Sequence, residues 1–103
     1  MRKLVNKAGL DDFVSNNPLV LVFYEAMWCG PARMIRPKIE EFENVYTQVS
    51  FGCVNVDDNA EASEAEGISA MPTTILYKDG QKHGEVVGAI EEKIREALNI
   101  LVA

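Results

Sequence analysis

An uninterrupted apolar run over residues 19–24 (LVLVFY) places the strongest constraint on the fold of this chain. A strand with one face in water alternates apolar and polar residues, whereas a continuous run rich in β-branched residues needs cover on both faces. The run is far shorter than the roughly 20 apolar residues that a transmembrane helix requires. The sequence therefore predicts a central strand in a sheet that carries helices on both faces.

Strand and helix signals alternate on either side of this run. Asparagine, Gly-Pro, Asp-Gly and single glycine positions supply the caps and turns between them. The expected elements are a strand over 2–5, a helix over 6–16, the strand over 19–24, a helix after Gly30-Pro31 with an apolar stripe from Ile35 to Val49 and Pro37 inside it, a strand over 51–56, a helix over 60–66, a hairpin of strands 73–77 and 85–87, and a final helix with its stripe between Ile90 and Leu101.

Length and charge narrow the class of protein. The 103 residues suit one compact domain, which we expect to span 1–103. Sixteen acidic residues against ten basic ones give a net charge of −6, which disfavours nucleic acid and anionic membrane surfaces as partners. No apolar stretch of signal-peptide type follows Met1, so we expect a reducing, cytoplasmic location. In that setting Cys29 and Cys53 are interpreted as thiols rather than as a disulfide.

The segment Trp28-Cys29-Gly30-Pro31-Ala32 places a thiol on the first turn of the helix that follows the central strand. A helix N-terminus carries unpaired N–H groups and a partial positive charge, which stabilise a thiolate. Cys29 is therefore the candidate nucleophile. No metal site is expected, because His83 is the only histidine and both cysteines are far from it in sequence.

The order of elements, together with four short motifs, resembles the thioredoxin family. The motifs are Trp28-Cys29-Gly30-Pro31, Met71-Pro72-Thr73, Lys78-Asp79-Gly80 and Val87-Gly88-Ala89, in the family's order and over nearly the whole chain. The resemblance implies an α/β thioredoxin fold. Its mixed central sheet would combine parallel strands with an antiparallel hairpin and carry helices on both faces.

The resemblance also implies a chemistry for Cys29. In the family, the counterpart of Cys29 attacks a substrate disulfide, and a second cysteine then resolves the mixed disulfide. Ala32 occupies that second position here, so the covalent adduct is expected to persist until an outside thiol releases it. We interpret Ala32 as an engineered replacement of cysteine in an otherwise ordinary dithiol protein, with natural loss as the alternative.

The implied partners are disulfide-containing proteins and an NADPH-dependent thioredoxin reductase, and the chain itself needs no cofactor. Family resemblance further implies a cis bond before Pro72 and an apolar substrate groove, with strand-like hydrogen bonds from the substrate to Met71. The residues expected to line the groove are Trp28, Gly30, Pro31, Ala70, Met71, Pro72, Gly88 and Ala89.

Two positions depart from the family's pattern. Phe23 stands where the family usually has a buried aspartate, and Cys53 stands where it often has lysine or glutamate. The two replacements are consistent with each other, since a buried lysine without its carboxylate would be costly. We interpret Cys53 as a packing residue. Glu25 is a candidate substitute base, whereas Asp57-Asp58 are expected to cap or solvate a loop.

Three hypotheses for function follow. The leading one is a thioredoxin-type disulfide reductase whose present chain traps its substrate. The second is a natural monothiol protein that works with glutathione. The third is a binding module that uses the same groove without catalysis. Formation of a covalent adduct with a disulfide substrate separates the first two from the third.

Overall fold

A computed structural model describes all residues, 1–103, and contains the predicted alternation of strands and helices. The elements are β1 (Arg2–Lys3), α1 (Lys7–Asn16), β2 (Leu19–Glu25), α2 (Gly30–Val45), β3 (Ser50–Asn55), α3 (Ala60–Glu66), β4 (Thr73–Lys78), β5 (Gln81–Val87) and α4 (Glu91–Val102).

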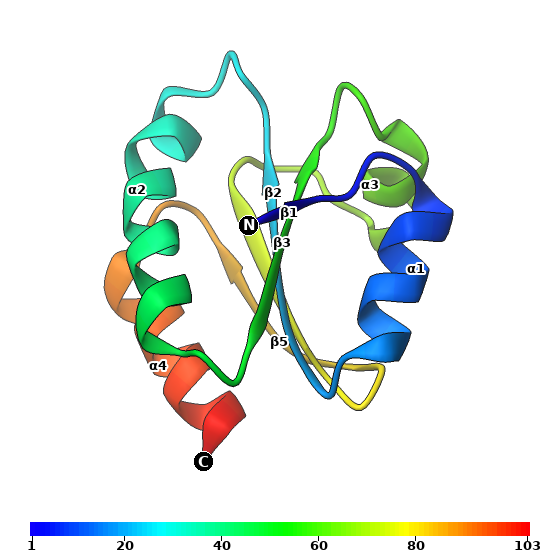
Figure 1. Cartoon of the computed structure of the whole chain (residues 1–103). Helices are drawn as coiled ribbons and strands as arrows, with labels where there is room; N and C mark the ends of the chain where they lie inside the picture. Colours follow the sequence, from blue (N-terminus) through cyan, green and yellow to red (C-terminus); the bar gives the residue numbers. More distant parts are fainter.

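The five strands form one sheet in the order β1-β3-β2-β4-β5, so β2 is the central strand, as predicted. It pairs in parallel with β3 and antiparallel with β4. Figure 1 shows α2 and α4 on one side of the sheet and α1 and α3 on the other. This is the thioredoxin fold expected from the sequence, with a parallel part and an antiparallel hairpin.

The two faces of β2 explain its continuous apolar run. Leu21 and Phe23 belong to the core cluster that includes α2 and α4. Val20, Val22 and Tyr24 belong to a second cluster on the face of α1 and α3. All five side chains are fully buried, so each needs an apolar neighbour whichever way it points.

Asparagine caps and turn residues begin and end the helices as the sequence indicates. The Asn6 side chain accepts the amide of Gly9 at 2.7 Å at the start of α1. Asn59 does the same for Ala62 at the start of α3, and Gly67 ends that helix with a φ of 73°. No helix combines the length and apolar character needed to cross a membrane.

Element ends differ from the predictions in several places, and β5 begins at Gln81, four residues before its predicted start at 85. The first strand covers only Arg2–Lys3, although the Leu4 amide still donates to the Cys53 carbonyl at 2.9 Å. Helix α2 contains Pro37 but ends at Val45, with the Tyr46 amide donating to Phe42 at 2.8 Å. The prediction that the helix continues to Val49 was therefore wrong. The predicted burial of Val49 is confirmed, because its side chain packs in the core from a loop.

Both edges of the sheet carry short or charged strands. β1 has only two residues, at one edge. At the other edge, β5 exposes Lys82 and His83, as predicted, and Lys82 pairs with Glu85 at 2.6 Å. A register shift also interrupts the pairing of β4 with β5 between Leu76 and Tyr77.

Candidate active site

Cys29 lies where the chain leaves β2 and begins α2. It is the N-cap residue of α2, and its carbonyl accepts the Arg33 amide at 3.1 Å. The Cys29 amide donates back to Ala26 at 3.1 Å, which closes the connecting turn. Pro31 occupies the first turn, where its missing N–H removes no helical hydrogen bond. The local sequence thus fixes the thiol at the positive end of a 16-residue helix.

The bend at Met71-Pro72 lies directly against this thiol. The Cys29 thiol donates to the Met71 carbonyl at 3.6 Å, and the Met71-Pro72 bond is cis, as predicted. The Gly88 amide donates to the Pro72 carbonyl at 2.8 Å, which holds the start of the next loop beside the bend. Gly88 has a φ of 100°, a conformation that favours glycine. These contacts bring together segments that are far apart in sequence.

The residues predicted to line the groove differ in exposure. Gly30, Pro31, Ala70 and Ala89 are exposed, Met71 and Gly88 are half-buried, and Pro72 is buried. The Thr73 hydroxyl donates to the Ala70 carbonyl at 2.7 Å and so fixes the loop before the bend.

Trp28 is a large apolar side chain left in solvent, with 69% of its surface exposed. Its indole Nε1 donates to the Asp57 carboxylate at 3.0 Å. The sequence prediction for Asp57, a loop cap or solvated residue, missed this contact. A signal was present, because β2 and β3 are parallel and the residues after their carboxyl ends meet at one edge of the sheet. Asp57 therefore orients the side chain that precedes Cys29.

Ala32 is fully buried one turn into α2 and packs in the same core cluster as Cys29. The other thiol of the chain, Cys53, is on β3, and both cysteines are free. The position that would hold a resolving sulfur is thus filled by a methyl group inside the core.

Phe23 and Cys53 are register partners on β2 and β3 and lie in the same core cluster. Only 4% of Cys53 is exposed, which agrees with its interpretation as a packing residue. Burial raises the pKa of the Cys53 thiol, and the negative charge of Glu25 raises it further, whereas Arg36 opposes the shift. Cys53 is therefore held as a neutral thiol near neutral pH.

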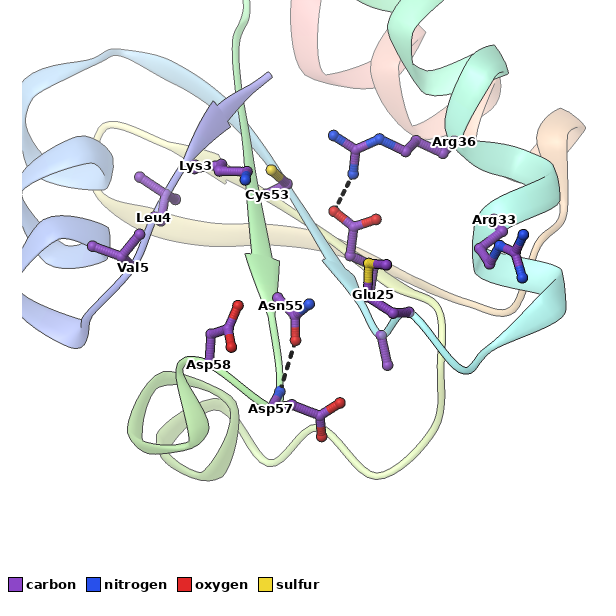
Figure 2. A pocket seen from close by; sticks show the side chains of 12 residues that line it. Lys3, Leu4, Val5, Glu25, Arg33, Arg36, Cys53, Asn55, Asp57 and Asp58 are labelled. Carbon is purple, nitrogen blue, oxygen red and sulfur yellow. Dashed lines mark hydrogen bonds and ion pairs between the residues drawn. The ribbon is translucent and has the colours of Figure 1, made fainter.

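Glu25, the candidate substitute base, is engaged by another side chain. It ends β2, and Figure 2 shows its carboxylate facing the guanidinium of Arg36 from α2, with which it forms an ion pair. Hydrogen bonding to Glu25 raises the pKa of Arg36. The pair joins the central strand to α2 next to Cys53. A role for Glu25 as a base stays a prediction.

A cysteine that begins a helix opposite a cis-proline, on a five-stranded mixed sheet, defines the thioredoxin-fold class of thiol–disulfide oxidoreductases. Comparison with known proteins agrees. The family model described as Thioredoxin matches residues 2–100. The chain belongs to the thioredoxin family.

Relatives match over nearly their whole length. Thioredoxin-1 of Schizosaccharomyces pombe is 36% identical over 98 residues, which cover 95% of each chain. Thioredoxin-1 of Saccharomyces cerevisiae is 39% identical over 88 residues, or 85% of each. Among solved structures, Fasciola hepatica thioredoxin superposes with a TM-score of 0.95 at 38% identity, covering 98% of this chain and 99% of that one. The chain is therefore a thioredoxin-family oxidoreductase.

Proposed function

We propose that Cys29 attacks protein disulfides and that this chain holds its substrate as a mixed disulfide. The Cys29 thiolate attacks one sulfur of the substrate disulfide and forms a new S–S bond with it. The substrate's own S–S bond breaks, and its second sulfur leaves as a thiolate that takes up a proton. One disulfide is consumed and one is formed, so this step needs no cofactor.

One observation carries the proposal: the Cys29 thiol begins α2 and lies 3.6 Å from the Met71 carbonyl in a bend that the β4–β5 hairpin supports. The helix N-terminus stabilises the thiolate, both as attacking group and as leaving group. The Met71 amide lies at the same place and makes no backbone hydrogen bond. A substrate strand that pairs with it would bring its disulfide to Cys29.

Trp28 and the exposed loop residues supply the rest of the proposed groove. The indole flanks Cys29 and is held by Asp57, while Ala70 and Ala89 lie on the loops around the Pro72 bend. Small side chains leave room for varied substrates, and Met71 adds an adaptable contact. This surface suits disulfide-containing proteins in general.

Ala32 decides how the cycle ends. A thiol one turn into α2 would attack Cys29 and release the reduced substrate, but Ala32 has no sulfur and is fully buried. The adduct therefore waits for an outside thiol. We interpret the chain as a cysteine-to-alanine form of a dithiol thioredoxin of a reducing, cytoplasmic compartment. Its dithiol counterpart would be reduced again by an NADPH-dependent thioredoxin reductase.

Mass spectrometry of the chain after incubation with native insulin, whose disulfides are intact, tests the first half of the proposal. The expected product is a covalent adduct at Cys29 that a reducing agent removes. A chain that forms no adduct would be a binding module instead. An adduct that only glutathione resolves, with full turnover, would favour the natural monothiol alternative.

Turnover of insulin by an Ala32→Cys variant tests the second half. The added sulfur lies one turn from Cys29, so we expect the variant to reduce insulin catalytically with NADPH and thioredoxin reductase. The unchanged chain should release little product under the same conditions. An Ala32→Ser variant is the matched control, because it adds a polar atom without a sulfur. If Ala32→Cys gains no turnover, the reductase proposal fails.

A further inference from the structure

A cavity of about 560 Å³ lies behind the loop that joins β2 to α2, and Cys29 does not line it. Its volume falls within the roughly 300–1,000 Å³ typical of small-molecule sites. The wall combines apolar groups with charged side chains from β1, the end of β2, α2 and the loop after β3 (Figure 2). The lining residues with charged side chains are Lys3, Glu25, Arg33, Arg36, Asp57 and Asp58.

Three of these six charges already have partners inside the protein. Arg36 and Glu25 neutralise each other across one wall. The Asp57 carboxylate accepts the hydrogen bond from Trp28. A ligand would therefore find Glu25 and Arg36 already paired with each other. It would find the Asp57 carboxylate with one hydrogen bond already made.

The other three charges are free. Lys3, Arg33 and Asp58 line the cavity but form no salt bridge, unlike Lys7, Lys38 and Lys82 elsewhere on the surface. Figure 2 shows Lys3 and Asp58 on the side of β1 and the loop after β3, and Arg33 on α2 at the other side of the view. Two unpaired cations and one unpaired carboxylate remain for a ligand to neutralise.

We propose that this cavity binds a short acidic peptide that carries two carboxylates and one ammonium group. The carboxylates would pair with Lys3 and Arg33, and the ammonium with Asp58. Leu4, Ala26 and Cys53 supply apolar wall for the carbon chain between the charges. The site is separate from the groove at Cys29, so the inference does not depend on the proposed function.

A ligand in the cavity would change the position of Trp28 in the active site through Asp57. The ligand's ammonium would lie beside two consecutive carboxylates, Asp57 and Asp58, and would compete with the Trp28 indole for Asp57. A weaker hold on Trp28 changes the position of the side chain that precedes Cys29. Trp28 is the only tryptophan of the chain, so its emission reports this event directly.

Titration with S-methylglutathione, followed by calorimetry and by Trp28 emission, tests the proposal. This tripeptide has two carboxylates and one ammonium, and its methylated sulfur cannot react with either cysteine. We expect saturable binding, weakened by added salt, with a matching change in emission. Its N-acetyl derivative lacks the ammonium and should bind about fivefold to tenfold more weakly, as expected for the loss of one charge-assisted contact.

Two pairs of variants place the site. Lys3→Ala and Asp58→Asn should each weaken binding about fivefold to tenfold. Lys93→Ala and Asp12→Asn remove charges that are also exposed but do not line the cavity, and they should leave binding unchanged. Amide shifts in an NMR titration should fall on Val5, Asn55 and Asp58.

Three results would overturn the proposal: no saturable binding at millimolar peptide, equal weakening by the cavity variants and their controls, or amide shifts confined to Met71, Gly88 and Ala89 in the active-site groove. Saturable binding at the cavity with unchanged emission would overturn the link to Trp28.

Discussion

The two cysteines of this chain are almost equally buried but lie in opposite kinds of surroundings. Cys29 is 7% exposed and Cys53 is 4% exposed. Cys29 begins a helix beside an exposed indole and the Met71-Pro72 bend. Cys53 lies within a strand, against Phe23 and near an ion pair. The fraction of surface exposed does not separate the proposed reactive thiol from the proposed packing thiol, whereas the element that carries each thiol does.

The largest expected effect is on alkylation rate. In the folded chain iodoacetamide should modify Cys29 faster than Cys53 by a factor of about 100 or more, because Cys53 reacts only when the strand opens. Peptide mapping by mass spectrometry at successive times measures both rates. In urea that unfolds the chain, the two rates should become similar. Equal rates in the folded chain would remove the distinction between the two sites.

The second largest effect is expected on stability, when the glycine beside each cysteine is replaced by alanine. A Cβ at Gly52, before Cys53, would lie 2.8 Å from Leu4 and 2.9 Å from Phe13, whereas a Cβ at Gly30, after Cys29, meets nothing within 4 Å. Gly52→Ala should lower the free energy of unfolding by about 1–3 kcal/mol through overpacking. Gly30→Ala should leave it unchanged or raise it by up to about 1 kcal/mol. Urea denaturation of both variants measures the difference, and equal effects would contradict the packing described for β3.

A smaller effect is expected from the charge next to Cys53. Glu25→Gln, in a Cys29→Ser background, should lower the Cys53 pKa, because the Glu25 carboxylate raises it and Arg36 opposes the shift. Ultraviolet absorbance of the thiolate follows the titration. The folded pKa lies above the ordinary value of 9.0, so the unfolded chain loses the proton first and stability falls as the pH rises above 9. That alkaline loss should shrink in the variant. Glu64→Gln, at an exposed acid of α3 that is not among the charges acting on Cys53, should leave the pKa unchanged.

The smallest effect is expected on the opposite face of the sheet, at the residue after Phe23. Burial raises the pKa of Tyr24 from 10.0 to about 12, so stability should fall between these pH values as the unfolded chain ionises. The Tyr24 hydroxyl makes no hydrogen bond of ordinary geometry, and the nearby Tyr77 hydroxyl opposes the rise in its pKa. Tyr24→Phe should therefore change the free energy of unfolding by no more than about 1 kcal/mol at neutral pH and should reduce the alkaline loss. Denaturant curves at both pH values provide the measurement. A loss of several kcal/mol at neutral pH would show that the hydroxyl is bonded.

Local patterns predicted the parts of the fold that depend on neighbouring residues. The run over 19–24 predicted a central strand, and Asn6 and Gly67 predicted helix ends, because burial period and capping are properties of short segments. The family resemblance supplied the cis bond before Pro72. The pairs Trp28–Asp57 and Glu25–Arg36 were not predicted, because each joins side chains whose approach depends on how whole elements pack. The end of α2 at Val45, before the predicted Val49, likewise depends on how the helix packs against the rest of the chain.

The edges of the sheet have a consequence for the proposed mixed-disulfide complexes. A protein that presents extended backbone to many partners risks adding further chains at its open strands and aggregating. Here the β1 edge is two residues long, and the β5 edge carries an ion pair next to a register shift. The β1 edge is too short to offer a ladder, and charged side chains on the seven-residue β5 disfavour pairing with another molecule. The chain should therefore accumulate as discrete one-to-one conjugates that stay in solution and can be isolated by size.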